Sequence, residues 1–288
     1  MIPVGFSSFL DRIQLNCYSR PAQFSEPFNR ISTVSDRLCA IHTTLNGLGI
    51  LTFSGKRTAS SRDLLEHLNR QIVLIAAAEE IKGILLTGSD AGFCCCSPET
   101  PVSPQVASQL SGFGQKTMFH LEKIGKPAIA VIEGECTGLG LEIALACDFI
   151  VASESASFGF PDIATGQIPF CGGTQRLARL VGKSKTKELI YSGDLIDAEE
   201  AFRVSLINRL YPVGEALSHA EKLLEHICTR SANAIRIGGE VINSGYDIDL
   251  QTACMLERDA FALCFASFDQ REGMQAFLDK RAPQFKGE

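Results

Sequence analysis

The chain has 288 residues, of which 45% are hydrophobic and 21% charged, so it can bury a full core and is not a disordered chain. Its formal net charge is −6 and it has no long basic run, which argues against nucleic acid or an anionic membrane surface as a partner. No apolar stretch approaches the roughly 20 residues that span a bilayer, and residues 1–15 lack the basic and apolar regions of a secretion signal. We therefore expect a cytoplasmic protein.

The first regular structure is expected near Asp36, because residues 1–35 show no sustained period and form an N-terminal extension. Two β-prone stretches follow, residues 38–45 and 48–53, and they flank Asn46 and Gly47. An Asn-Gly pair between such stretches is a strong signal for a β-hairpin.

Helical and extended patterns then alternate along the chain. We expect a helix over 61–78, a short buried strand over 83–87, a loop over 88–104 that is rich in Gly, Ser, Cys and Pro, and a helix over 104–123. Further strands are expected over 148–152 and 157–159, and further helices from about 174, 183 and 197. This alternation predicts an α/β fold.

After residues 206–211 the pattern becomes almost wholly helical, with helices expected near 214–229, 232–244, 249–266 and 270–280. We therefore divide the chain into an N-terminal extension (1–35), an α/β core (36–210) and a helical C-terminal region (211–288). The helical region is expected to pack on the core or on another subunit.

The segment 126–177 contains the clearest candidate for chemistry. Residues 127–132 are expected to form a buried strand, 134–140 a tight loop, and 141–147 the start of a helix. Backbone N–H groups at a helix N-terminus can stabilise a developing negative oxygen. Glu142 and Asp162 lie beside this loop, which suggests acid/base chemistry, although a first-turn Glu also stabilises a helix and an Asp after Pro161 also suits a turn.

Two other motifs are weaker. Gly138 and Gly140 resemble the start of a dinucleotide-binding turn, but the third glycine would fall at Ile143. They fit better a loop whose backbone approaches a ligand, and a helix turn that needs glycine only for tight packing is the alternative. Eleven cysteines are scattered through apolar runs, which favours buried packing in a reducing compartment. The consecutive Cys94, Cys95 and Cys96 point in alternating directions in an extended loop, so we expect packing or a reactive thiol there and no metal site.

From Asp36 to Glu288 the chain resembles the enoyl-CoA hydratase/isomerase (crotonase) superfamily. The resemblance is carried, in family order, by the segments 83–89, 134–148, 158–162, 171–177, 193–198, 271–277 and 280–286. It implies a crotonase-like α/β fold with a ββα spiral core and a helical C-terminal trimerisation region. It also implies an acyl-CoA thioester as partner, no metal or redox cofactor, and a homotrimer or dimer of trimers.

The same resemblance implies roles for individual residues. The backbone N–H groups of Ser97 and Leu139 would form an oxyanion hole, and Glu142 and Asp162 would hold a water that adds to C3 of a trans-2-enoyl thioester while C2 is protonated. The resemblance also implies that Glu142 deprotonates the water and that Asp162 handles the C2 proton. Residues expected to bind substrate are Cys95 and Gly138 in the two loops and the cations Lys56, Arg57, Lys280 and Lys286, which solvated surface charge would also explain.

This chain departs from the family pattern at three positions. Cys96 replaces a glycine and Pro98 an aspartate in the first oxyanion loop, and Asp162 replaces the glutamate of hydratases. The prediction is an enoyl-CoA hydratase. The alternatives are an enoyl-CoA isomerase, another acyl-CoA hydrolase or decarboxylase of the same fold, and an acyl-CoA-binding protein with impaired catalysis.

Overall fold

The structure is a computed structural model that describes residues 38–54, 60–88, 92–94 and 102–288. All of these residues belong to one unit, Ser32–Glu288. The N-terminal extension and the candidate residues Lys56, Arg57, Cys95 and Ser97 lie outside the described residues.

The centre of the fold is a six-stranded sheet with the order β1-β2-β3-β4-β6-β9. The hairpin expected around Gly47 is confirmed, because β1 and β2 pair antiparallel, and each later neighbour in the sheet pairs parallel. The strands are β1 (Cys39–Thr43), β2 (Leu48–Phe53), β3 (Gly83–Thr87), β4 (Ala128–Ile132), β6 (Phe149–Ser153) and β9 (Arg209–Tyr211).

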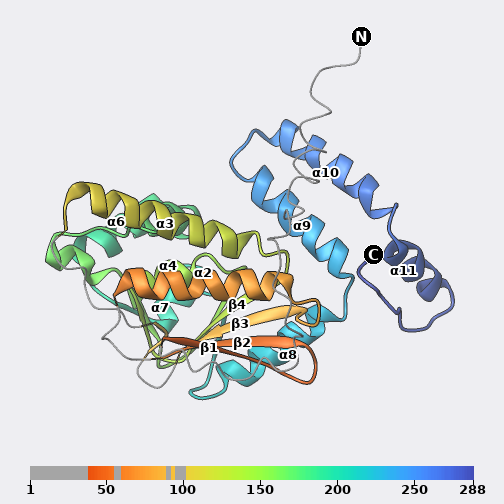
Figure 1. Ribbon diagram of the computed structural model, residues 1–288, viewed down its shortest axis with the longest axis horizontal. Helices are drawn as coiled ribbons and strands as arrows, with labels where there is room; N and C mark the ends of the chain where they lie inside the picture. The colour runs from red at the N-terminus through yellow and green to blue at the C-terminus, as the bar shows by residue number, and fades with distance from the viewer. Residues whose placement is uncertain (1–37, 55–59, 89–91, 95–101) are drawn as a thin grey trace, which may run out of the picture. The chain divides into compact units, whose positions relative to one another are not determined.

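Both faces of this sheet are buried by helices, which explains why β3 and β4 are continuous apolar runs. On one face α2 (Ser61–Ala77) and α3 (Pro104–Glu122) cover a large core that includes Leu51, Leu86 and Leu68. On the opposite face α8 (Ala216–Cys228) covers Ile50, Leu85 and other alternate residues of the strands (Figure 1). The strand alternation therefore sends neighbouring residues into two separate cores.

A second, three-stranded sheet lies beside the candidate site and has the order β5-β7-β8. Its strands are β5 (Glu135–Thr137), β7 (Ser157–Gly159) and β8 (Ile196–Asp197). The expectation of a plain loop over 134–140 was wrong, because residues 135–137 pair with β7. The helix after it, α4 (Leu139–Ala144), begins at Leu139 and not at residue 141, since Gly138 is the N-cap.

The remaining elements follow the expected order, with small differences at their ends. The 3-10 helix η1 (Pro161–Thr165) was not predicted; it is followed by α5 (Gly173–Val181), α6 (Lys183–Ser192) and α7 (Ala198–Arg203). The C-terminal helices are α9 (Ala232–Gly245), α10 (Leu250–Cys264) and α11 (Phe268–Leu278). Among the described cysteines, Cys39 and Cys136 are buried as expected, but Cys264 is only partly buried and Cys254 is exposed, so the expectation does not hold in the C-terminal helices.

The C-terminal helices α9, α10 and α11, together with the residues that cap them, expose many large apolar side chains. These are Ile242, Tyr246, Leu250, Met255, Phe261, Phe265, Met274, Phe277 and Leu278. Within the described residues, no helix is both long and apolar enough to span a membrane.

Candidate active site

Glu142 is an acidic residue of α4, and its side chain lies inside the protein. The residue is 1% exposed. Its Oε1 accepts hydrogen bonds from the backbone N–H groups of Cys171 and Gly173, both at 2.7 Å. Its Oε2 accepts one longer bond, at 3.3 Å, from the N–H of Phe170. Oε1 is thus fully engaged, while Oε2 retains capacity for another partner.

The turn that supplies these donors depends on two glycines. Gly172 has φ of +106°, a conformation that other residues rarely adopt. A Cβ on Gly173 would lie 2.9 Å from both Cγ and Oε1 of Glu142. The sequence segment 171–174 therefore carries a glycine pair because the backbone must both turn sharply and approach the carboxylate closely.

Burial and hydrogen bonding act on Glu142 in opposite directions. Desolvation raises its pKa, the N–H groups of Gly173, Cys171 and Phe170 lower it, and the charge of Asp162 raises it again, with a net pKa of about 7. A carboxyl group with such a pKa can exchange a proton near neutral pH.

Asp162 is the second carboxylate of the site and lies in η1. A Cβ on Gly138 would be 3.2 Å from both carboxylate oxygens of Asp162, so this carboxylate lies directly over the Gly138 backbone. Its Oδ2 is buried and has no hydrogen-bond partner within the part of the chain that the structure describes. Burial raises the pKa of Asp162 above its ordinary value, partly offset by its own backbone N–H. A buried oxygen of this kind is a place for a ligand or a water.

The N-terminus of α4 provides a backbone donor at the same place. Gly138, with φ of +53°, turns the chain from β5 into the helix, and its N–H donates to Gly159 O at 3.1 Å. As the first residue of α4, Leu139 has an N–H without an acceptor inside the helix. Gly140 allows Cys94 of the first loop to approach, since a Cβ there would lie 3.0 Å from Cys94 O.

The structure therefore brings together four of the residues singled out in the sequence: Gly138, Leu139, Glu142 and Asp162. The backbone donors of the turn at 170–173 were not predicted. The glycine pair at 172–173 was a signal for them, but nothing in the sequence says which carboxylate that turn meets.

Lys280 and Lys286 lie in the C-terminal segment and contact α11. Lys280 N donates to Phe277 O, and the Lys286 ammonium lies 4.4 Å from the centroid of the Phe268 ring. Their expected role in binding coenzyme A stays a prediction. The same holds for Lys56, Arg57, Cys95 and Ser97, which are outside the described residues.

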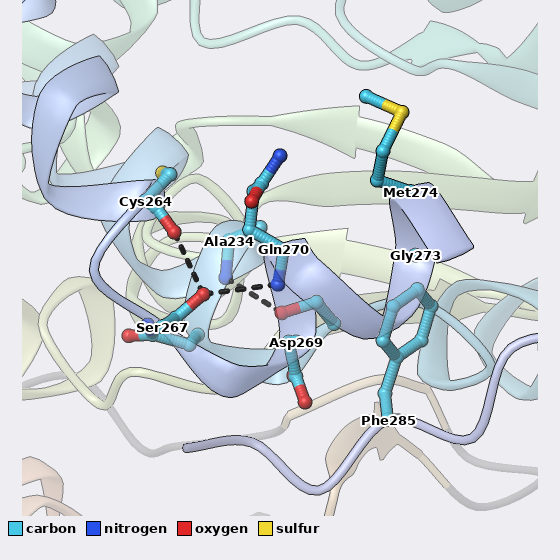
Figure 2. A pocket seen from close by; sticks show the side chains of 10 residues that line it. Ala234, Cys264, Ser267, Asp269, Gln270, Gly273, Met274 and Phe285 are labelled. Carbon is cyan, nitrogen blue, oxygen red and sulfur yellow. Dashed lines mark hydrogen bonds between the residues drawn. The ribbon is translucent and has the colours of Figure 1, made fainter. Parts of the chain in front are cut away.

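A separate cavity of about 240 Å³ lies among α9, α10 and α11 (Figure 2). Its lining is mostly apolar and includes Met274 and Phe285. The carboxylate of Asp269 beside it is already engaged by the N–H groups of Lys286 and Gly287. Neither Glu142 nor Asp162 lines this cavity. Among the residues that can be described, no group of three or more His, Cys, Asp or Glu side chains could hold a metal ion.

Comparison with known proteins agrees with this geometry. Residues 51–288 match the family model for enoyl-CoA hydratase/isomerase, and the chain belongs to this family. It is 35% identical over 251 residues to a probable mitochondrial enoyl-CoA hydratase of Dictyostelium discoideum, covering 86% of this chain and 91% of the relative.

Other relatives show the same likeness. The chain is 36% identical to crotonyl-CoA hydratase of Syntrophomonas wolfei, over 79% of this chain and 89% of the relative. The crystal structure of an enoyl-CoA hydratase from Bacillus anthracis superposes with a TM-score of 0.80 at 32% identity, over 87% of this chain and 99% of the other. The crotonase-like fold expected from the sequence is thereby confirmed.

We predict that Glu142 lowers stability at neutral and alkaline pH. Because its folded-state pKa is about 7 against an ordinary 4.5, the folded protein loses stability as pH rises from 4.5 through 7. Between pH 5 and pH 8 the free energy of unfolding of the wild type should fall by about 2 kcal/mol relative to Glu142→Gln, which carries no titrating group.

Urea denaturation at the two pH values measures this difference. Glu154→Gln, the same substitution at an exposed position, should follow the wild type. If the free energy of unfolding changed with pH by the same amount in Glu142→Gln and in the wild type, this result would contradict a raised pKa at Glu142.

Proposed function

We propose that the protein is an enoyl-CoA hydratase that adds water across the 2,3 double bond of a trans-2-enoyl-CoA. The observation that carries this proposal is the pairing of the buried carboxylate of Glu142 with the half-buried carboxylate of Asp162, each with an oxygen open to a ligand, next to the N-terminus of α4. Family membership and the names of the relatives support the same reaction.

In this proposal the nucleophilic water lies between the two carboxylates. Oε1 of Glu142 is engaged by two N–H groups, so Oε2 is the oxygen that can accept a hydrogen bond from water. Oδ2 of Asp162 is the other open acceptor. A water held between these two oxygens has its protons directed at carboxylates and a lone pair free for C3 of the substrate.

The addition requires charge to develop on the thioester oxygen. As the water oxygen bonds to C3, the electron pair of the double bond moves through C2 onto the carbonyl oxygen and forms an enolate. The N–H of Leu139 would donate to this oxygen, and a donor of this kind contributes about 3 kcal/mol to the transition state. The N–H of Ser97 is the expected second donor.

The protons balance on the two carboxylates. Glu142 accepts the proton that the water loses, and Asp162 delivers a proton to C2, so the pair holds one proton before and after the reaction. The bridging water lets that proton pass between the two acids, and the reactive form is the Glu142 carboxylate with protonated Asp162.

Several finer features belong to the same proposal. Addition of water to a conjugated thioester is redox-neutral and uses the two carboxylates as acid and base, so we propose that no metal or redox cofactor takes part. We also propose a cytoplasmic location. Two relatives are named as mitochondrial proteins, so import into mitochondria is the alternative that a localisation experiment would detect.

We further propose that copies of the chain associate into a homotrimer or a dimer of trimers. The apolar side chains exposed on α9, α10 and α11 support this, because exposed apolar surface of this extent usually marks an interface. Leu250 is 80% exposed and Phe277 is 77% exposed. Light scattering on the purified protein should give a mass of three or six chains, and a monomer mass would contradict the assignment.

The activity is tested with crotonyl-CoA. The wild type should consume the conjugated enoyl absorbance and form 3-hydroxybutyryl-CoA. Glu142→Gln and Asp162→Asn should each lower kcat by about 100-fold or more, because each removes one proton-transfer group. Glu154→Gln, with an exposed side chain, should retain full activity.

Product analysis separates the alternatives. Formation of a shifted double bond from a 3-enoyl-CoA without any hydration would favour an isomerase. Binding of crotonyl-CoA that raises the melting temperature without turnover would favour an impaired binding protein. Either result would contradict the hydratase proposal.

The pH dependence of kcat/KM should be bell-shaped, since the active free enzyme holds one proton on the pair. The rate should fall above about pH 7, as the last proton leaves the pair through the raised pKa of Glu142. The rate should also fall at low pH, where Asp162 and Glu142 are both protonated. The midpoint of this acid limb should lie at a pH above the ordinary pKa of an aspartate, because burial raises the pKa of Asp162. A flat profile across pH 5 to 9 would contradict the shared proton.

A further inference from the structure

One of the peptide groups that donate to Glu142 has its carbonyl oxygen hydrogen-bonded by side chains of α3. The peptide between Phe170 and Cys171 donates its N–H to Glu142 Oε1 at 2.7 Å. Its carbonyl, Phe170 O, accepts hydrogen bonds from Ser111 Oγ at 2.7 Å and from Gln115 Nε2 at 3.3 Å. Because the N–H and C=O of a trans peptide point in opposite directions, fixing the carbonyl also aims the N–H.

Ser111 and Gln115 act as a unit on α3. They are four residues apart, so they lie on the same side of the helix, and Gln115 Nε2 also donates to Ser111 Oγ at 3.1 Å. The result is a chain of hydrogen bonds from Gln115 through Ser111 and the peptide to Glu142. Each bond in such a chain polarises the next, so a donor at the carbonyl end strengthens the N–H at the other end.

The other short donor to Glu142 has a different support. The peptide between Gly172 and Gly173 also donates to Oε1, but its carbonyl accepts from the backbone N–H groups of Gln175 and Arg176 at 3.0 and 2.9 Å. Helix α5 thus holds that peptide without any side chain. Between the two short donors, only the Phe170–Cys171 peptide has its carbonyl held by side chains, and these come from another helix.

We propose that Ser111, supported by Gln115, is a positioning residue that aims and strengthens the Cys171 N–H on Glu142 and so sets the proton affinity of that carboxylate. Ser111 contacts Phe170 O and not Glu142 itself, so it acts through the peptide group. The inference rests on the proposed function, in which Glu142 exchanges a proton during turnover. The inference gives Ser111 of α3 a role in a site that is otherwise formed by α4, η1 and the turn at 170–173.

The effect of Ser111 on the pKa of Glu142 can be measured apart from the effect of the charged groups around Glu142. Asp162 of η1 is the charged residue that acts on Glu142 from across the site, and it raises its pKa. Behind the turn, the Arg176 guanidinium of α5 donates to Cys171 O at 3.0 Å and is paired with Glu122 of α3 at 2.6 Å. Substitutions at Ser111 and Gln115 change none of these charges.

The test uses the double variant Ser111→Ala/Gln115→Leu, because Gln115 alone could still reach Phe170 O. Loss of the two donors weakens the Cys171 N–H, which destabilises the Glu142 carboxylate and raises its pKa. The alkaline limb of kcat/KM should move to higher pH by about half a unit, while the acid limb stays in place. Ser111→Thr/Gln115→Leu, which keeps a hydroxyl at position 111, should restore most of the wild-type profile.

Ser218→Ala is the matched control, because the Ser218 hydroxyl donates to a backbone carbonyl at the N-cap of α8, Glu215 O at 3.0 Å, far from this turn in the sequence. It should leave both limbs unchanged. A merely structural role for Ser111 would lower the melting temperature of the double variant and leave the alkaline limb where it is. That outcome would overturn the proposal.

A direct titration keeps the test independent of turnover. The carboxyl carbon of Glu142 can be followed by carbon-13 NMR in protein with labelled glutamate, with Glu142→Gln to assign its signal. The double variant should titrate about half a unit higher than the wild type. If the wild type hydrates no enoyl thioester but this shift is seen, the proposed function fails and the positioning role stands; if the two titrations coincide, the positioning role fails.

Discussion

Burial of the Glu142 carboxylate is the constraint on which the rest of the site depends. A charged group removed from water is costly unless several hydrogen bonds replace its hydration, and here three backbone N–H groups of one turn do so. Because two of them bind the same oxygen, the carboxylate has one engaged face and one open face. The opposing effects of burial and hydrogen bonding leave its pKa at about 7, where it can both accept and release a proton.

The fold meets this constraint from several sides. The parallel strands β4 and β6 are buried on both faces, and the short sheet of β5, β7 and β8 places α4 and η1 beside each other. Gly138 and Gly173 then let the backbone approach the two carboxylates closely, since a Cβ would lie 3.2 Å from the Asp162 oxygens and 2.9 Å from Glu142 Oε1. Burying the Glu142 carboxylate lowers the free energy of unfolding, and functional sites commonly carry such a cost in stability.

Much of this arrangement could be predicted from the sequence. The hairpin at Gly47 and the apolar strand β4 follow from local patterns, and Glu142 and Asp162 stood out as carboxylates beside a glycine-containing turn. The pairing of β5 with β7 could not be predicted, because three-residue strands carry too little periodicity. Nor could the roles of Ser111 and the turn at 170–173, since hydrogen bonds between residues 59 positions apart depend on the tertiary fold.

A crystal structure with bound butyryl-CoA would show directly whether the nucleophilic water lies between the two open carboxylate oxygens. Butyryl-CoA is a saturated thioester, so it cannot be hydrated. We expect a water within hydrogen-bond distance of both Glu142 Oε2 and Asp162 Oδ2, and the thioester oxygen within hydrogen-bond distance of the N–H of Leu139. A bound thioester whose oxygen lies elsewhere, or a site in which no water bridges the two carboxylates, would contradict this expectation.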